Sequence, residues 1–104
     1  MEGKNTATKT LLDAAELLSE REKTYGDPAK NFARIARIAS VILDRRVSRY
    51  EIAAIMVAVK LGRVPNDPAY ADSYDDAINY LAFMKMFSKE HEAIGKFLEK
   101  IQSV

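Results

Sequence analysis

Apolar residues recur at helical spacing through most of the chain. Between Leu11 and Leu18 they return every three or four positions until Tyr25 and Gly26 interrupt the pattern, which predicts a first amphipathic helix. Asp27 and Pro28 then provide an N-cap and a proline at the first position of a second helix. The buried side of that helix is predicted to consist of Phe32, Ile35, Ala36, Ile38, Ala39, Ile42 and Leu43.

A third helix is predicted from Ser48 and Glu51, whose spacing is typical of a capping box. The run that follows, residues 52–59, is apolar on nearly every side. A helix without a polar face is normally central to a bundle or lies between subunits. We therefore expect this helix at the centre of the fold or at an interface between copies.

The two prolines in residues 64–68 predict a loop, and a fourth helix with a broad apolar face begins soon after it. Ser88 is the expected start of a fifth, amphipathic helix covering residues 88–104. Its narrow apolar stripe consists of Ile94, Phe97, Leu98 and Ile101.

The pattern as a whole contains no alternating strand signal, no internal repeat and no low-complexity tract. We therefore predict one all-α domain over residues 1–104, a bundle of four to five helices preceded by a flexible polar leader at residues 1–6. A chain of this length can form a core, and oligomerisation would help to bury its apolar faces.

Charge and composition limit the function further. Sixteen basic and fifteen acidic residues leave a net charge of +1, which gives no global reason to expect nucleic acid or membrane binding. The chain has no cysteine and a single histidine, His91, which we expect to be exposed near a helix start, so any metal must be held by oxygen. No apolar run approaches the length of a membrane span, and we expect a soluble cytoplasmic protein.

Three carboxylates crowd the start of the fourth helix. At 100° per residue, Asp72, Asp76, Asn79 and Tyr80 share one stripe, with Asp75 about 60° to the side. Carboxylates so placed repel one another unless a cation or solvent relieves them. Magnesium suits such oxygen ligands and usually accompanies a phosphorylated substrate, which points to a nucleotide site. The alternative is that the acids only favour the positive end of the helix dipole.

Lys60 and Glu51 on the third helix each have two interpretations. Lys60 could meet a phosphate, or its stem could pack on apolar surface while the ammonium reaches water. Glu51 could ligate a metal, although its capping position already explains it. Nine positions apart, the two lie on opposite faces of the helix, so one small site can include both only if the ligand wraps around or another subunit contributes.

The junction between the first two helices concentrates polar and aromatic residues. Gly26 and Asp27 account for the turn. Arg21, Tyr25 and Asn31 are left over, and they could respectively clamp a phosphate, stack on a base and hydrogen-bond its edge. Taken singly, each could equally be a surface or helix-packing residue.

Three pieces of sequence together resemble a known family. They are Arg21-x3-Tyr25-Gly26-Asp27-Pro28-x2-Asn31-Phe32-x2-Ile35-Ala36, Met56-x3-Lys60, and Asp72-Ser73-x2-Asp76-x3-Tyr80. The combination, which covers residues 21–81, resembles a small domain of unknown function common in bacteriophages and prophages. That domain looks like a branch of the all-α, MazG-like nucleoside triphosphate pyrophosphohydrolases. The resemblance implies a helical bundle that is dimeric or higher, in a bacterial or phage-infected cell.

MazG-like enzymes hold magnesium with acids in an ExxE pattern on one helix and an ExxD pattern on the next. By this resemblance Asp76 takes the place of the second motif's aspartate, and Asp72 or Asp75 replaces its glutamate. Glu51 stands for the first acid of the other motif, but Ala54 occupies the second position. The lost carboxylate and the added Lys60 weaken the attraction for magnesium, which puts catalysis in doubt more than nucleotide binding.

Three hypotheses follow. The first is a magnesium-dependent pyrophosphohydrolase, with catalytic Asp72 and Asp76 and with Glu51, Asp72 and Asp76 as metal ligands. Its substrate-binding residues would be Arg21, Tyr25, Asn31, Lys60 and Tyr80. The second is a non-catalytic oligomer that binds or sequesters a nucleotide. The third is a helical protein-interaction module that uses its C-terminal amphipathic helix.

Overall fold

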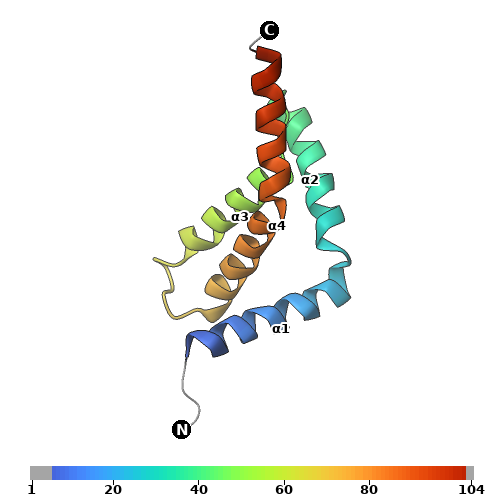
Figure 1. Cartoon of the computed structure of the whole chain (residues 1–104). Helices are drawn as coiled ribbons and strands as arrows, with labels where there is room; N and C mark the ends of the chain where they lie inside the picture. Colours follow the sequence, from blue (N-terminus) through green and yellow to red (C-terminus); the bar gives the residue numbers. More distant parts are fainter. Residues whose placement is uncertain (1–5, 103–104) are drawn as a thin grey trace.

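The computed structural model describes residues 6–102, apart from the side chains of Phe97 and Leu98. Within that range the chain forms helices and no strand, as the sequence predicts (Figure 1). The helices are α1 (Ala7–Tyr25), α2 (Pro28–Leu43), α3 (Arg49–Arg63) and α4 (Ala71–Gln102).

Side chains cap the first three helices where the sequence indicates a start. Thr6 and Asp27 each accept a hydrogen bond from a backbone N–H of the first turn of α1 and α2. At α3 the predicted capping box is confirmed: Ser48 Oγ accepts from the Glu51 N–H at 3.1 Å, and Glu51 Oε1 accepts from the Ser48 N–H at 2.9 Å. Except for Thr6, the predicted flexible leader lies outside the described residues.

The turn between α1 and α2 depends on Gly26. Its backbone has φ 84° and ψ −158°, a conformation that is essentially restricted to glycine. A Cβ built at this position would meet no atom within 4 Å, so the backbone geometry, rather than a lack of space, requires glycine here. This turn sets the angle at which α1 leaves α2.

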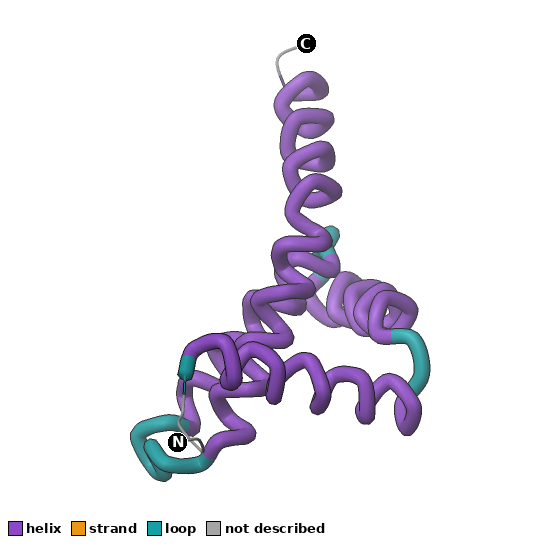
Figure 2. Tube along the Cα trace, turned by 60° about the horizontal axis from the view of Figure 1, so that its bottom comes forward, coloured by secondary structure: helices purple, strands orange, loops and turns teal. Residues whose placement is uncertain are grey.

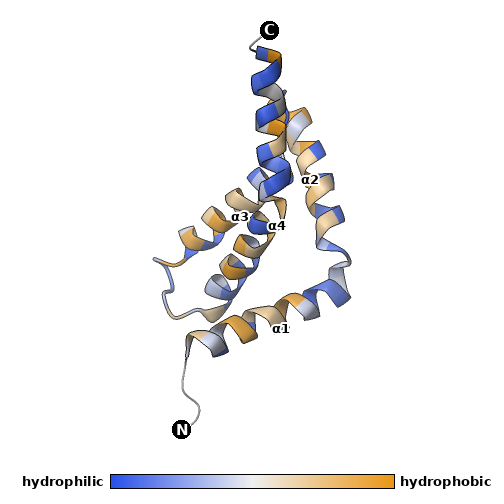
Figure 3. Cartoon of the chain, in the orientation of Figure 1, coloured by the Kyte–Doolittle hydropathy of each residue, from blue (hydrophilic) through white to orange (hydrophobic). Residues whose placement is uncertain are grey.

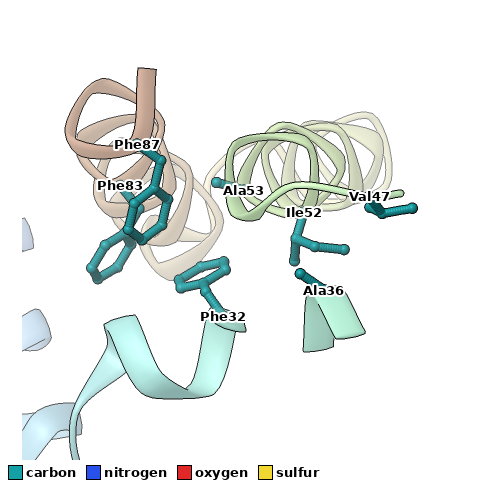
Figure 4. Packing of buried hydrophobic residues seen from close by; sticks show 7 residues of the cluster. All are labelled: Phe32, Ala36, Val47, Ile52, Ala53, Phe83 and Phe87. Carbon is teal, nitrogen blue, oxygen red and sulfur yellow. The ribbon is translucent and has the colours of Figure 1, made fainter. Parts of the chain in front are cut away.

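The hydrophobic core joins α2, α3 and α4. The most extensive packing is between α3 and α4, which lie side by side, while α1 crosses the first half of α4 (Figures 1 and 2). Phe32 of α2 inserts between the other two helices, with its ring centroid 5.0 Å from Phe83 and 5.5 Å from Phe87 (Figure 4). Each ring buried in this way stabilises the fold by about 1.5–3 kcal/mol. The buried cluster is Phe32, Ala36, Val47, Ile52, Ala53, Phe83 and Phe87.

The predicted fifth helix does not form separately, because α4 runs without interruption through Ser88 to Gln102. The hydroxyl of Ser88 donates to the Lys85 carbonyl at 2.7 Å within the helix instead of capping a new one. The last turns of α4 project beyond the other helices (Figure 2). The end of the predicted segment, residues 103–104, and the side chains of Phe97 and Leu98 lie outside the described structure.

The expectation that His91 is exposed near a helix start was also wrong. His91 lies inside α4 and is half-buried: its Nδ1 is 3.0 Å from Ser48 Oγ, and its ring stacks on Tyr50 at a centroid distance of 4.6 Å. These contacts attach the start of α3 to the middle of α4. They extend the α3–α4 packing past Ser88.

The fold is elongated and leaves apolar surface uncovered. Its radius of gyration is 16.5 Å, against about 13 Å for a compact domain of 100 residues. Apolar residues gather at the C-terminal half of α2, where Val41 is 81% exposed and Ile42 is 74% exposed (Figure 3). On α3, Ala53 is fully buried whereas Ile55 is about half exposed, so one side of this helix faces the core and the other side faces solvent.

Within residues 6–102, no helix has both the length and the hydropathy for a membrane span.

Candidate functional site

A pocket of about 320 Å³ opens where the end of α1 and the start of α2 face α4. Its wall is mainly apolar and aromatic, with a few polar side chains, which is the usual composition of a small-molecule site. The lining residues are Leu18, Arg21, Glu22, Tyr25, Gly26, Pro28, Asn31, Phe32, Ile35, Met56, Asp76, Asn79, Tyr80 and Phe83.

An ion cluster of Asp76, Lys60 and Arg21 joins three helices at this pocket. The Asp76 carboxylate is buried, with Oδ2 3.0 Å from Lys60 Nζ on α3 and Oδ1 3.3 Å from Arg21 Nη2 on α1. The Lys60 side chain is only 14% exposed and is not part of the pocket wall, whereas the Arg21 side chain lines the wall and is 43% exposed. Asp76 is therefore a counter-ion for two cations, one behind the pocket and one at its surface.

Helical spacing on α4 explains why several of the polar groups face the pocket. Asp76, Asn79, Tyr80 and Phe83 follow one another at three or four residues and so share a face. Asn79 Nδ2 also donates a hydrogen bond of 2.9 Å to the carbonyl of Ala14, which is almost completely buried. This bond holds α1 against α4 and fixes one side of the pocket.

Four polar side chains on the wall make no hydrogen bond or ion pair to another residue in the part of the chain that the structure describes. They are Glu22, Tyr25, Asn31 and Tyr80. Tyr25 is 80% exposed at the rim. The Tyr80 ring packs edge-on against the Phe32 ring, with the two ring centroids 6.1 Å apart. These groups can donate to or accept from a bound molecule without first giving up a bond within the protein.

Glu51, one of the predicted metal ligands, lies outside this pocket. Its carboxylate accepts the capping bond from Ser48 and lies 3.3 Å from Arg45 Nη1. The hydrogen bond from the Ser48 backbone lowers the pKa of Glu51 below its ordinary value of 4.5, burial opposes the shift, and Arg45 adds to it. The cap occupies one carboxylate oxygen and the ion pair with Arg45 occupies the other.

Asp72 and Asp75 also lie outside the wall of this pocket. Asp72 accepts a hydrogen bond of 3.3 Å from the Tyr70 hydroxyl, and Asp75 lines a separate cavity of about 630 Å³ together with Asp13. Partial burial raises the pKa of Asp75 above its ordinary value of 3.8, the negative charges of Asp13, Asp72 and Asp76 add to that effect, and Lys9 opposes it.

The acidic residues thus do not form one metal-binding cluster among the described residues. Among residues 6–102, no three histidine, cysteine, aspartate or glutamate side chains lie close enough to hold a metal ion, so the predicted set of Glu51, Asp72 and Asp76 does not converge. By contrast, Arg21, Tyr25, Asn31, Asp76 and Tyr80 all line one pocket, and Lys60 contacts it through Asp76.

Sequence reasoning did not assign a site role to Asn79, Glu22 or the wall residue Phe83. The position of Asn79, three residues after Asp76 on the same stripe, was a usable signal. The sequence gives no comparable indication that Glu22 lines the pocket, because the position of Glu22 there depends on how α1 packs against α4.

Comparison with known proteins places the chain in a family. Residues 9–88 match the model of a domain of unknown function, DUF6378, and the chain belongs to that family. It is also similar to the Gene 55 protein of Mycobacterium phage D29, with 31% identity over 85 residues, which is 80% of this chain. The chain spans 56% of the length of that relative. No solved structure matches it significantly.

Proposed function

We propose that this member of the DUF6378 family binds a nucleotide in the pocket between α1, α2 and α4, and that it does so without a metal. The observation that carries the proposal is the convergence of five side chains on one cavity, with Lys60 paired to one of them, Asp76; the five are Arg21, Tyr25, Asn31, Asp76 and Tyr80. A volume of about 320 Å³ is at the lower end of the range for small-ligand sites, which is about 300–1,000 Å³. The resemblance to MazG-like bundles supports the same class of ligand.

The wall offers a distinct contact for each part of a nucleotide. Tyr25, at the exposed rim, can stack on the base, because an aromatic face is tolerant of base identity. Asn31 has both amide donors and a carbonyl acceptor available for the base edge. Arg21 combines a fixed position with partial exposure, so its guanidinium can pair with a phosphate at the mouth of the pocket.

Asp76 serves in this proposal as a positioning residue. Its carboxylate holds Arg21 at the pocket surface and compensates the charge of Lys60. A magnesium ion at Asp76 would have to compete with two cations that already lie 3.0–3.3 Å from the carboxylate oxygens. Coulomb repulsion from both would oppose the ion, which is why we favour binding over magnesium-dependent hydrolysis.

The test is calorimetric titration with each common ribo- and deoxyribonucleoside mono- and triphosphate in EDTA. We expect at least one to bind, to be recovered unchanged, and to bind about tenfold or more weakly to Arg21→Gln. Arg37→Gln is the matched control, since Arg37 is exposed on α2 and outside the pocket. Failure of the whole panel to bind would reject the proposal.

The hydrolase alternative makes an opposite prediction in the same assay. Release of pyrophosphate on adding Mg²⁺, lost in Asp76→Asn, would favour a pyrophosphohydrolase of the MazG type. In that outcome Asp76 would be a metal ligand, and its two cationic partners would have to move away from it.

We further propose that the protein forms homo-oligomers. The exposed apolar end of α2, with Ile38, Val41, Ile42 and Leu43 each at least 54% exposed, supports this, because a lone domain rarely leaves such a patch uncovered. We propose that a second copy of the chain covers this end of α2, since the elongated fold leaves apolar surface that its own core does not bury. Light scattering should show a multimer for the wild type and a monomer for Val41→Glu; a wild-type monomer would refute it.

A further inference from the structure

We infer that the pocket selects a nucleotide with a single phosphate group over a di- or triphosphate. This inference rests on the proposed nucleotide binding and adds the class of ligand. The observation behind it is the balance of charge around the cavity: Glu22 and Asp76 on the wall carry as much negative charge as Arg21 and Lys60 carry positive charge.

The two cations are not equally available to a ligand. Lys60 is 14% exposed, lies behind Asp76 and does not line the cavity, so its charge is compensated before any ligand arrives. Arg21 shares Asp76 with Lys60, yet almost half of its side chain is accessible. Arg21 is therefore the one cationic side chain that the described wall presents to a phosphate.

Glu22 determines what happens to a second phosphate. Glu22 follows Arg21 in the sequence, lines the same pocket, is exposed, and its side chain has no hydrogen-bond or ion-pair partner among the described residues. A phosphate chain that extends from Arg21 adds negative charge to a pocket that Glu22 also lines, and the described wall holds no second cation to compensate that charge. Like charges held close together repel one another, and the repulsion is stronger where solvent is partly excluded.

A single phosphate avoids most of this repulsion. It pairs with Arg21, while the base and sugar occupy the apolar and aromatic part of the cavity beside Phe32, Tyr80 and Phe83. Asp76 and Lys60 keep the guanidinium in place without adding charge at the mouth. We therefore assign Glu22 as the residue that determines specificity for the number of phosphates.

The experiment is a calorimetric series in EDTA with the mono-, di- and triphosphate of one nucleoside, the one whose phosphates bind best in the panel. For the wild type we expect the monophosphate to bind about tenfold more tightly than the triphosphate. In Glu22→Gln, triphosphate binding should strengthen about fivefold and monophosphate binding by no more than about twofold. High salt should narrow the difference, because it screens exposed charges.

Glu20→Gln is the matched control. Glu20 lies on the same helix, is exposed and does not line the pocket, so its replacement removes the same charge elsewhere. The control should leave the ratio between the two ligands unchanged. A wild type that binds the triphosphate most tightly, or an equal response to both substitutions, would overturn the selectivity while leaving nucleotide binding intact. If no nucleotide binds at all, the proposed function fails as well.

Discussion

Asp75 and Asp76 are neighbours in the sequence, yet they lie in opposite electrostatic surroundings. Asp76 faces the end of α1 and the last turn of α3, where Arg21 and Lys60 compensate its charge. Asp75 lines a cavity with Asp13 of the first half of α1, and its pKa is raised by partial burial and by the nearby carboxylates, an effect that Lys9 only partly opposes.

The difference shows that an acidic cluster on a helix is not one site. Successive residues are turned by about 100°, so two adjacent carboxylates contact different neighbours. Whether each one is compensated depends on the helix packed against it. Here one carboxylate is a structural counter-ion at a candidate pocket, and the other is a source of repulsion at a second cavity.

The largest expected effect is the loss of the Asp76 charge. Asp76→Asn leaves Lys60, only 14% exposed, without its counter-ion, and should lower the free energy of unfolding by about 3 kcal/mol. Urea denaturation followed by helical circular dichroism measures it. Adding Lys60→Met should recover about half of the loss, because the remaining site no longer contains an uncompensated cation. A loss below about 1 kcal/mol would mean that the pair is not a buried ion pair in solution.

Glu51 extends the comparison to a carboxylate that stabilises a helix start. Glu51→Gln should cost about 1 kcal/mol at pH 7, because the capping acceptor loses its charge. The pKa of Glu51 is lowered in the folded state, so its stabilisation is complete above the ordinary pKa of 4.5 and is lost as pH falls through the folded value. Denaturation at a series of pH values should therefore show the two proteins converging in acid. If the difference in free energy of unfolding between the two proteins did not change with pH, the charge of Glu51 would not be what stabilises the helix start.

Arg21→Gln separates stability from binding at the pocket. Its side chain is 43% exposed and Lys60 still compensates Asp76, so the free energy of unfolding should fall by less than about 1 kcal/mol. Nucleotide affinity should nevertheless fall much more than it does in the control Arg37→Gln. A large loss of stability with unchanged nucleotide affinity would show that Arg21 stabilises the fold and does not bind the nucleotide.

Asp75→Asn should give the smallest effect, and one of opposite sign. We expect a gain of about 0.5 kcal/mol at pH 7, since the substitution removes a carboxylate that is ionised against its surroundings. Because the pKa of Asp75 is raised in the folded state, the wild type loses stability as pH rises from 3.8 through the folded value. The gain should therefore vanish in acid when melting temperatures are compared across pH. A loss of stability in Asp75→Asn at pH 7 would show that the ionised Asp75 makes a stabilising contact in the folded protein.

The helices could be predicted from the sequence because their signals are local. The capping box at Ser48, the Asp27-Pro28 start and the apolar spacing each depend on residues within one or two turns. The continuity of α4 could not be predicted in this way. Past Ser88, α4 packs through contacts of His91 with Ser48 and Tyr50, which are more than forty positions away.

The sequence indicated which residues could belong to the candidate site better than it indicated how they are arranged. Arg21, Tyr25 and Asn31 stood out because the turn did not explain them, and the structure places all three on one wall. The set of Glu51, Asp72 and Asp76 does not assemble. Glu51 and Asp72 contact residues close to them in the sequence, whereas Asp76 contacts cations on α1 and α3, which it reaches only because of the angle between the helices. That angle depends on packing over the whole bundle, which no motif encodes.

The most direct test of the central claim is a titration of the best-bound nucleoside monophosphate into the wild-type protein, once in EDTA and once in excess Mg²⁺. If Asp76 is a counter-ion for Lys60 and Arg21, the two dissociation constants should agree within about twofold, because no metal takes part. Binding seen only with Mg²⁺, and lost in Asp76→Asn, would contradict the account and make Asp76 a metal ligand.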